Sequence, residues 1–308
     1  MISTILEFAK QMDAVLGQVS QSIAQTIATM DGMAGAVSKA MENAERVMHK
    51  AYKGFLEVAR MGQRFSFIMV ELGWPPHASL TPREMRQIVD VYDQHGPAEA
   101  GRIVNEYMLT RYDSELIEDM YQRWEDSRWL RTRLPILRQA IDAHLDGKYF
   151  VSVPSLLPQI EGIIAEGHAH RGRLMGPVLR EYSEKLLSDR GFFSFDEAIW
   201  QFLDEVVLAR FEHGVGSYPT FSRHAILHGA DTEYGTATNS LKCILLFDYV
   251  QAKFRVASVG NGKAYHANWC PVVQKHRMHR AKPMITTYSS TQAAEKAGKV
   301  ACKLCKPQ

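Results

Sequence analysis

The chain has 308 residues, enough for a sizeable hydrophobic core and for two or three domains. Its composition, 46% hydrophobic and 23% charged, is ordinary for a globular protein and excludes a low-complexity chain. The net charge of +2 conceals a division, because residues 251–308 hold eleven Lys and Arg against Glu295 alone. This basic tail predicts contact with a polyanion, and a solubilising surface is the alternative.

Targeting and membrane-spanning segments are not expected. Lys10 and Asp13 interrupt the first apolar stretch before the apolar core of a secretory signal can form. No window holds eighteen uninterrupted apolar residues, so we expect no membrane partner. Three of the four cysteines lie within the last 39 residues, which indicates a metal site and not a disulfide framework. Together these features predict a cytoplasmic protein.

The first 76 residues are predicted to form a long helical, coiled-coil-like region. Between residue 3 and about residue 60, apolar residues recur at alternating steps of four and three, which is typical of one long helix. Gly32 and Gly35 weaken the pattern. An intermolecular coiled coil and a helix packed on its own body both remain open. Pro75 and Pro76 end the region.

Residues 77–254 are expected to form an all-α body, because no persuasive run of strand-type alternation occurs there. A helix is predicted to begin after Ser79 or Thr81, with Pro82 at its first position. A turn at 146–149 and Pro154 are predicted to open the helix at 155–167. The other helical patterns cover about 98–126, 128–146, 176–189, 195–212 and 236–253.

The sequence pattern of residues 255–308 is no longer that of helices. Residues 254–270 alternate and contain Gly260-Asn261-Gly262, which predicts a hairpin turn. Two close pairs of zinc-type ligands follow, and these are His266, Cys270, Cys302 and Cys305. A module of this size has too little core to fold alone, so structural Zn²⁺ would supply much of its stability. The fold class is therefore predicted as mainly α, with a long N-terminal helix and a small C-terminal α+β zinc module.

The tail resembles a known zinc-binding module. The strings GNGKAYHANWCPVVQK and ITTYSSTQAAEKAGKVACKLCKP are similar to the module related to the N-terminal domain of the Ada DNA-repair protein. The resemblance covers roughly residues 259–307 and departs from the pattern at Tyr288 and Val300, neither of which is a ligand. It implies a binding element for nucleic acid or a protein partner, and nothing else in the chain suggests methyl transfer.

The string RHAILHG (223–229) separates Arg223 and His228 by four residues. On a regular helix they would point about 140° apart, so one copy makes a poor self-contained site. Two copies across a twofold axis would place two guanidiniums and two imidazoles around one phosphate. Imidazole suits proton transfer at an RNA 2′-hydroxyl, and arginine suits neutralising a phosphate. The alternative is a catalytically inactive dimerisation unit.

A second resemblance covers residues 130–254. The Arg-x4-His pair, the string SRHAILHGADTEYGTATNSLKCILLFDYV (222–250) and the preceding LPILRQAIDAHLDGKYFVSVPSLLPQIEGII (134–164) resemble one branch of the HEPN domains. These are dimeric all-α ribonucleases of toxin and phage-defence systems. The resemblance implies an HEPN-type helical bundle in which Arg223 stabilises phosphate charge and His228 is the acid/base. His224 stands where asparagine is commonest, and it would support substrate or geometry.

The predicted function is therefore a metal-independent endoribonuclease that cleaves RNA by 2′-hydroxyl attack, as a homodimer or higher homo-oligomer with an antitoxin or sensor partner. One alternative is a non-enzymatic nucleic-acid-binding dimer that uses the basic zinc module, and another is a coiled-coil scaffold without either activity. Three residues are supporting candidates. Glu161, in an otherwise apolar helix, would orient Arg223 or His228, or pair elsewhere. Asn239 and Lys242 would bind phosphate, although helix capping explains Asn239 equally well.

Overall fold

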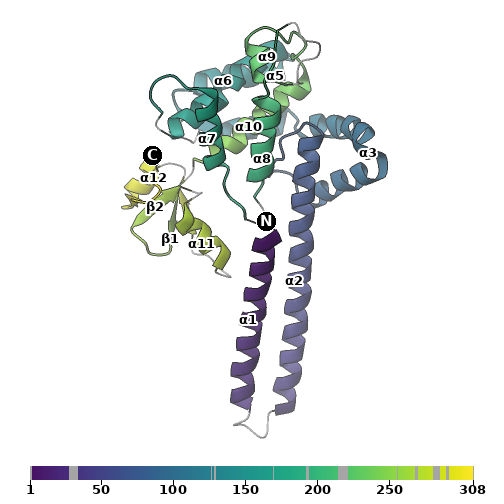
Figure 1. Ribbon diagram of the computed structural model, residues 1–308, viewed down its shortest axis with the longest axis vertical. Coiled ribbons are helices and arrows are strands. Elements are labelled where there is room, and N and C mark those ends of the chain that lie inside the picture. Colours follow the sequence, from purple (N-terminus) through teal and green to yellow (C-terminus); the bar gives the residue numbers. More distant parts are fainter. Residues whose placement is uncertain are drawn as a thin grey trace. The chain divides into compact units, whose positions relative to one another are not determined.

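The computed structural model describes residues 2–27, 34–125, 127, 130–168, 170–191, 194–213, 221–254, 256–267, 270–279, 285–288 and 291–307. The protein is mainly helical with a small sheet near its C-terminus (Figure 1), which confirms the predicted mainly α class with a small C-terminal α+β module. It divides into two compact units, Met1–Met61 and Gly62–Gln308. Among the helices in these ranges, none combines the length and the apolar character needed to cross a membrane.

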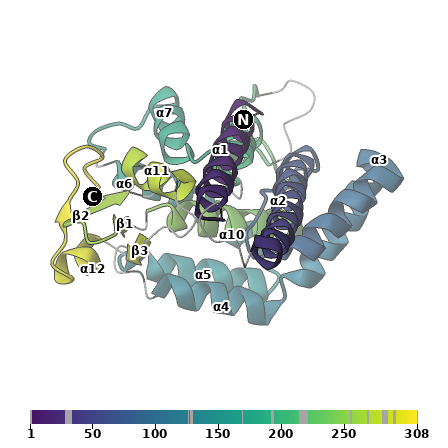
Figure 2. The same cartoon turned by 90° about the horizontal axis from the view of Figure 1, so that it is seen from below.

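The first unit contains α1 (Ile2–Ile27) and the first part of α2 (Ala34–Glu71), which run antiparallel beside each other (Figures 1 and 2). The single helix predicted from residue 3 to about 60 is therefore wrong, because α1 ends before α2 begins. The sequence between them includes Asp31 and Gly32, two residues of low helix propensity. Val19 and Val47 of the heptad pattern are exposed, so this pair of helices leaves part of the apolar seam uncovered.

The second unit contains the end of α2 and a helical body. The body comprises α3 (Pro82–Arg111), α4 (Ser114–Glu125), α5 (Leu134–Leu145), α6 (Tyr149–Gly167), α7 (Gly176–Leu186), α8 (Asp196–Phe202), the π-helix η2 (Leu203–Val207), α9 (Arg223–Leu227) and α10 (Ala237–Ala252). The central helix α10 packs most extensively on α6 and also contacts α3 and α5. Its residues Leu241, Ile244 and Leu245 are fully buried, as expected for a helix that is apolar on every side.

Local signals in the sequence set two helix starts. Thr81 begins α3 with a capping box, in which its Oγ1 accepts from the Glu84 backbone N–H at 3.3 Å and its own N–H donates to the Glu84 carboxylate at 2.6 Å. Thr236 begins α10 by accepting from the Asn239 backbone N–H at 3.1 Å. Thr81 is one of the two starting residues predicted for its helix, and Thr236 is the first residue of the helical pattern predicted at 236–253.

The start of α6 differs from the prediction. The helix begins at Tyr149, so Pro154 lies inside it and does not open it. A proline cannot donate to the carbonyl four residues before it, which here belongs to Phe150. That carbonyl accepts instead from the Tyr234 hydroxyl at 3.2 Å, and the two aromatic rings lie 5.3 Å apart. A distant loop thus replaces the hydrogen bond that the proline removes.

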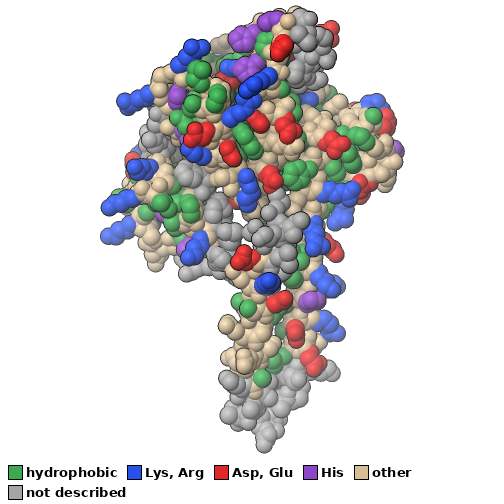
Figure 3. Space-filling view, in the orientation of Figure 1, with side chains coloured by type: hydrophobic (Ala, Val, Ile, Leu, Met, Phe, Trp, Pro, Cys, Tyr) green, Lys and Arg blue, Asp and Glu red, His purple; other side chains and the backbone are tan. Residues whose placement is uncertain are grey.

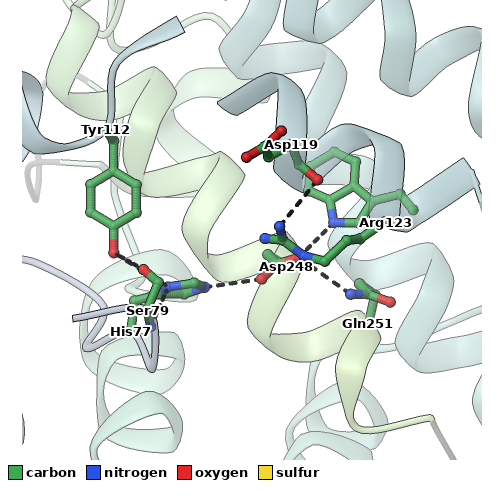
Figure 4. Close-up of polar contacts among 8 residues, drawn as sticks. His77, Ser79, Tyr112, Asp119, Arg123, Asp248 and Gln251 are labelled. Atoms are coloured by element: carbon green, nitrogen blue, oxygen red, sulfur yellow. Dashed lines mark hydrogen bonds and ion pairs between the residues drawn. The ribbon is translucent and has the colours of Figure 1, made fainter. Parts of the chain in front are cut away.

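A buried polar network joins the segment after α2 to α4 and α10 (Figure 4). Asp248 of α10 lies 3.1 Å from His77 Nε2 and accepts from Trp124 Nε1 at 2.6 Å. His77 Nδ1 accepts from the Ser79 backbone N–H at 3.3 Å, so His77 donates from Nε2 to the carboxylate. The Ser79 hydroxyl also lies 2.6 Å from the Tyr112 hydroxyl. Burial raises the pKa of Asp248, but His77 and Trp124 outweigh burial and lower the pKa overall.

The C-terminal module consists of β1 (Val256–Val259), β2 (Ala264–Ala267), α11 (Pro271–His279), β3 (Ile285–Tyr288), α12 (Thr291–Lys296) and β4 (Val300–Ala301). The sheet order is β3-β1-β2-β4, with β1 antiparallel to β2 and β3, and β2 parallel to β4. The predicted hairpin joins β1 to β2. Its Gly260 has a φ of 54°, and the Gly262 N–H donates to the Val259 carbonyl at 3.0 Å.

Candidate functional site

The short helix α9 carries the Arg-x4-His pair at its two ends. Ser222 begins the helix, because its hydroxyl accepts from the Ala225 N–H at 3.4 Å and donates to the Ala209 carbonyl at 2.9 Å. His228 caps the end, and its N–H donates to the His224 carbonyl at 3.1 Å. Gly229 follows with a φ of 74°, a left-handed conformation that favours glycine and ends the helix.

Glu161 of α6 anchors Arg223. The Arg223 Nη2 donates to Glu161 Oε2 at 2.6 Å, and Nε makes a second contact with Oε1. The two side chains are only 22% and 15% exposed. Burial raises the pKa of Glu161, and the Arg223 charge opposes this increase. The structure thus brings Glu161 to one of the two partners predicted for it.

His224 contacts the guanidinium group of Arg223. Its Nδ1 lies 3.2 Å from Arg223 Nη1, and because a guanidinium only donates, Nδ1 accepts and the ring proton sits on Nε2. Burial lowers the pKa of His224, and the positive charges of Arg223 and His228 lower it further. The ring is therefore neutral at physiological pH. It lies parallel to the His228 ring, with a centroid distance of 6.2 Å and an interplanar angle of 3°.

The His228 side chain, which lies parallel to His224, is exposed. Histidine side chains gather on the surface at the end of the body where α9 lies (Figures 1 and 3). One chain therefore arranges a row of four residues, Glu161, Arg223, His224 and His228, that runs from a largely buried carboxylate to an exposed imidazole. A fixed cation, a neutral imidazole and an accessible imidazole are groups that can bind an anion and transfer a proton.

The two remaining supporting candidates lie in other surroundings. Asn239 stabilises the start of α10, since its Nδ2 donates to the Tyr234 carbonyl at 3.0 Å. Lys242 lies over the rings of Trp74 and Phe221, with Nζ 5.2 Å and 5.8 Å from their centroids. Within the described residues, no hydrogen bond or ion pair joins either side chain to Arg223 or His228.

Arg180 of α7 is a neighbour of His224 that sequence patterns do not reveal. Its Nη2 donates to the Leu208 carbonyl at 2.8 Å, and its Nε pairs with Asp204 of the π-helix η2. The Arg180 charge also contributes to the lowered pKa of His224, after burial and the nearer charges. No spacing rule distinguishes this arginine within an amphipathic helix, because only packing brings α7 and η2 to α9.

The four predicted metal ligands meet in the C-terminal module. His266 comes from β2, Cys270 directly precedes α11, and the other two cysteines follow β4. All four side chains are buried, and their ligand atoms lie within 4.8 Å of one another. His266 presents Nδ1, which lies 3.3 Å from Cys270 Sγ. This group could hold a metal ion.

Backbone N–H groups around the cluster stabilise cysteine thiolates, the form of cysteine that binds a metal cation. The backbone N–H of Ala267 donates to Cys305 Sγ and that of Leu304 to Cys302 Sγ, both at 3.4 Å, and such donors stabilise thiolates. A tetrahedral site with Zn–S bonds of about 2.3 Å places its sulfurs about 3.8 Å apart, so the cluster needs little contraction. Three sulfurs and one imidazole fill all four positions of a closed site.

No family model, curated protein or solved structure matches the chain significantly. The likeness to HEPN domains and to the Ada-type module therefore depends on the motifs alone. The catalytic roles of Arg223 and His228 remain predictions.

Proposed function

We propose that the protein is an HEPN-type endoribonuclease with a site shared by two chains. The observation that carries the proposal is the row of Arg223, His224 and His228 along the capped helix α9, with Glu161 of α6 anchoring Arg223. The row presents an anchored guanidinium beside an exposed imidazole. One row offers a single accessible imidazole, whereas RNA cleavage needs both a base and an acid. A second copy across a twofold axis would supply the other.

The cleavage step follows from these groups. One imidazole takes the proton of the 2′-hydroxyl, whose oxygen attacks the adjacent phosphorus. The bond from phosphorus to the 5′-oxygen breaks, and the imidazolium of the second chain protonates that oxygen. The products are a 2′,3′-cyclic phosphate and a 5′-hydroxyl. Arg223 would neutralise the phosphate as charge develops, and Glu161 would keep its guanidinium in place. These residues supply proton transfer and charge neutralisation without a catalytic metal.

The C-terminal module would bind substrate or partner. Its cluster of His266, Cys270, Cys302 and Cys305 has the donor set and burial of a structural zinc site. The eleven basic residues of segment 251–308 favour a polyanion such as RNA. The toxin and phage-defence role, the antitoxin or sensor partner and the cytoplasmic location are inferred from the HEPN likeness and the sequence features.

Substitution of the two ends of α9 tests the activity. We expect Arg223→Ala and His228→Ala each to abolish cleavage of total RNA by the purified full-length protein. His228 is exposed, so His228→Ala should leave the melting temperature close to that of the wild type, whereas Arg223→Ala leaves Glu161 unpaired and should lower it. His224→Asn is the matched control, because asparagine is commonest at this position in HEPN domains and its amide oxygen can also accept from Arg223. Fragments ending in 2′,3′-cyclic phosphate support the proposed chemistry. Unchanged cleavage by the two alanine variants would overturn it.

A non-enzymatic nucleic-acid-binding dimer is the second candidate, favoured by the basic composition of the tail. It predicts salt-dependent RNA binding that is lost when residues 255–308 are deleted, with no RNA fragments formed by the full-length protein. An electrophoretic mobility shift series in increasing salt, with the same samples analysed for fragments, separates the two candidates.

A further inference from the structure

Lys242 is a buried cationic residue, and packing alone does not explain why a lysine occupies this position. Its side chain projects from the central helix α10, and the residue is only 7% exposed. Trp74 and Phe221 flank the ammonium group, and within the described residues no carboxylate pairs with it. Burial lowers the pKa of Lys242 to about 8. A buried lysine without a carboxylate destabilises a fold at neutral pH, so its presence requires a reason.

The ring of Phe221 indicates that reason. Phe221 has a φ of 70°, in the left-handed region that a bulky side chain rarely adopts. It is immediately followed by Ser222, which begins α9, and then by Arg223. The backbone of Phe221 therefore sets the direction in which the chain enters α9. Any interaction that holds Phe221 in this conformation also holds the orientation of the Arg-x4-His helix.

Trp74 fixes the other side of the ammonium group. Its ring is fully buried, and its Nε1 donates to Asn105 Oδ1 at 2.7 Å, so it is held by α3. The Lys242 ammonium group thus lies over both a buried, hydrogen-bonded indole and the ring of the strained Phe221. The attraction of a desolvated ammonium to an aromatic ring is of the same order as the penalty for a left-handed residue that is not glycine. The attraction to the ammonium group therefore offsets part of the strain at Phe221.

We propose that Lys242 is a positioning residue that holds Phe221 in its left-handed conformation and so orients α9 with Arg223. The inference rests on the proposed ribonuclease function, which it deepens. Lys242 would not touch RNA, and it would act through Phe221.

The same helix offers a matched control. Lys253, which directly follows α10 as its C-cap, also lies over an aromatic ring, with Nζ 4.9 Å from the centroid of Tyr249. Unlike Lys242, it forms an ion pair with the buried Asp196, and neither partner adjoins α9. Lys253→Met therefore removes a cation from a ring on α10 without disturbing the start of the Arg-x4-His helix.

Hydrogen–deuterium exchange of the full chain tests the positioning directly. The amides of Ala225 and Ile226 bond to the hydroxyl and the carbonyl of Ser222, so they report on the start of α9. In Lys242→Met we expect the peptide covering 221–229 to exchange about tenfold faster relative to α6. Lys242→Arg, which keeps a cation, should restore protection, and Lys253→Met should leave the ratio unchanged. Unchanged exchange in Lys242→Met, or no rescue by arginine, would overturn the inference.

RNA cleavage provides the second measurement. We expect Lys242→Met to lower kcat about tenfold with KM within about twofold of the wild type, because the catalytic groups are displaced while the RNA-binding surface remains. In a Phe221→Leu background the same substitution should have no additional effect. If the wild-type protein cleaves no RNA, the proposed function fails, and the exchange measurement alone decides whether Lys242 positions α9.

Discussion

Arg223 illustrates how neighbours decide what one side chain can do. A free guanidinium would contribute charge without fixed direction, but Glu161 holds two of its nitrogens and leaves Nη1 facing His224. Because Nη1 donates to His224 Nδ1, the proton of His224 is placed on Nε2. The departure from asparagine at position 224 is therefore compatible with the geometry, since an amide oxygen and a neutral imidazole nitrogen both accept.

Neutralising Glu161 tests its role as the anchor of Arg223. Glu161→Gln keeps the shape and one acceptor but removes the charge, so we expect RNA cleavage to fall about tenfold while the melting temperature changes little. Initial cleavage rates and thermal unfolding measure the two effects. Glu166→Gln is the control on the same helix, because its carboxylate pairs with Arg133 at 3.0 Å and is half exposed. An equal loss of cleavage in both variants would contradict a specific role for Glu161.

His144 makes stability depend on pH. Its Nδ1 lies 2.7 Å from Ser240 Oγ, which donates to Ser152 Oγ at 2.8 Å, so His144 donates from Nδ1. Burial lowers the pKa of His144 from 6.5 to about 4. The unfolded chain therefore binds a proton first, and stability that is complete above pH 6.5 is lost as the pH falls toward 4. The loss is about 3 kcal/mol at most.

Urea denaturation at pH 7 and pH 4.5 measures this dependence. We expect His144→Gln, whose amide can still donate to Ser240, to lose less stability than the wild type over this interval. Equal losses in the two proteins would show that other groups cause the acid sensitivity.

At the scale of elements, the features that could be predicted are those that adjacent residues determine. The capping box joins Thr81 and Glu84, which are three positions apart, and the glycines of the β1–β2 turn act within that turn. The interactions that assemble the body are distant in sequence. Glu161 and Arg223 are 62 positions apart, and His77 and Asp248 are 171 apart. Such pairs depend on helix packing, which periodicity does not specify.

Asp248 links three parts of the body through buried hydrogen bonds. Its carboxylate accepts from His77 and Trp124, and it joins the segment after α2 to α4 and α10. Asp248→Ala leaves both donors unpaired, so we expect the free energy of unfolding to fall by about 3–5 kcal/mol. Asp142→Ala, which removes an exposed partner of Arg138, should cost at most about 1 kcal/mol. Urea denaturation of the two variants measures the difference, and similar midpoints would contradict it.

The C-terminal module should depend on its metal for folding. We expect about one zinc ion per chain by mass spectrometry of the metal content, and its loss in Cys302→Ser. Chelation should then abolish exchange protection in β1 and β2 while α6 and α10 keep theirs, because the hydrophobic body does not use the ion. Protection of the strands that persists after the metal has been removed would contradict a metal-dependent fold.

At the scale of the whole molecule, the proposed catalytic site is formed by two chains together. Each chain contributes a single exposed imidazole at the end of α9, so a site that needs a base and an acid must use both copies. Activity measurements test whether two chains share one catalytic site, because an inactive subunit affects its partner only when the two form one site.

Mixing active and inactive subunits tests this directly. In a 1:1 co-expression of wild-type and His228→Ala chains, random pairing makes about one quarter of the dimers wholly wild type. A shared site therefore predicts about one quarter of the wild-type activity per total protein, and independent sites predict about one half. Tagging the two chains differently allows the mixed dimers to be purified and assayed alone. They should be as inactive as the His228→Ala homodimer, because their only remaining imidazole at this position cannot act as base and acid in the same cleavage step. Half-maximal activity in the purified mixed dimers would instead locate a complete site within one chain.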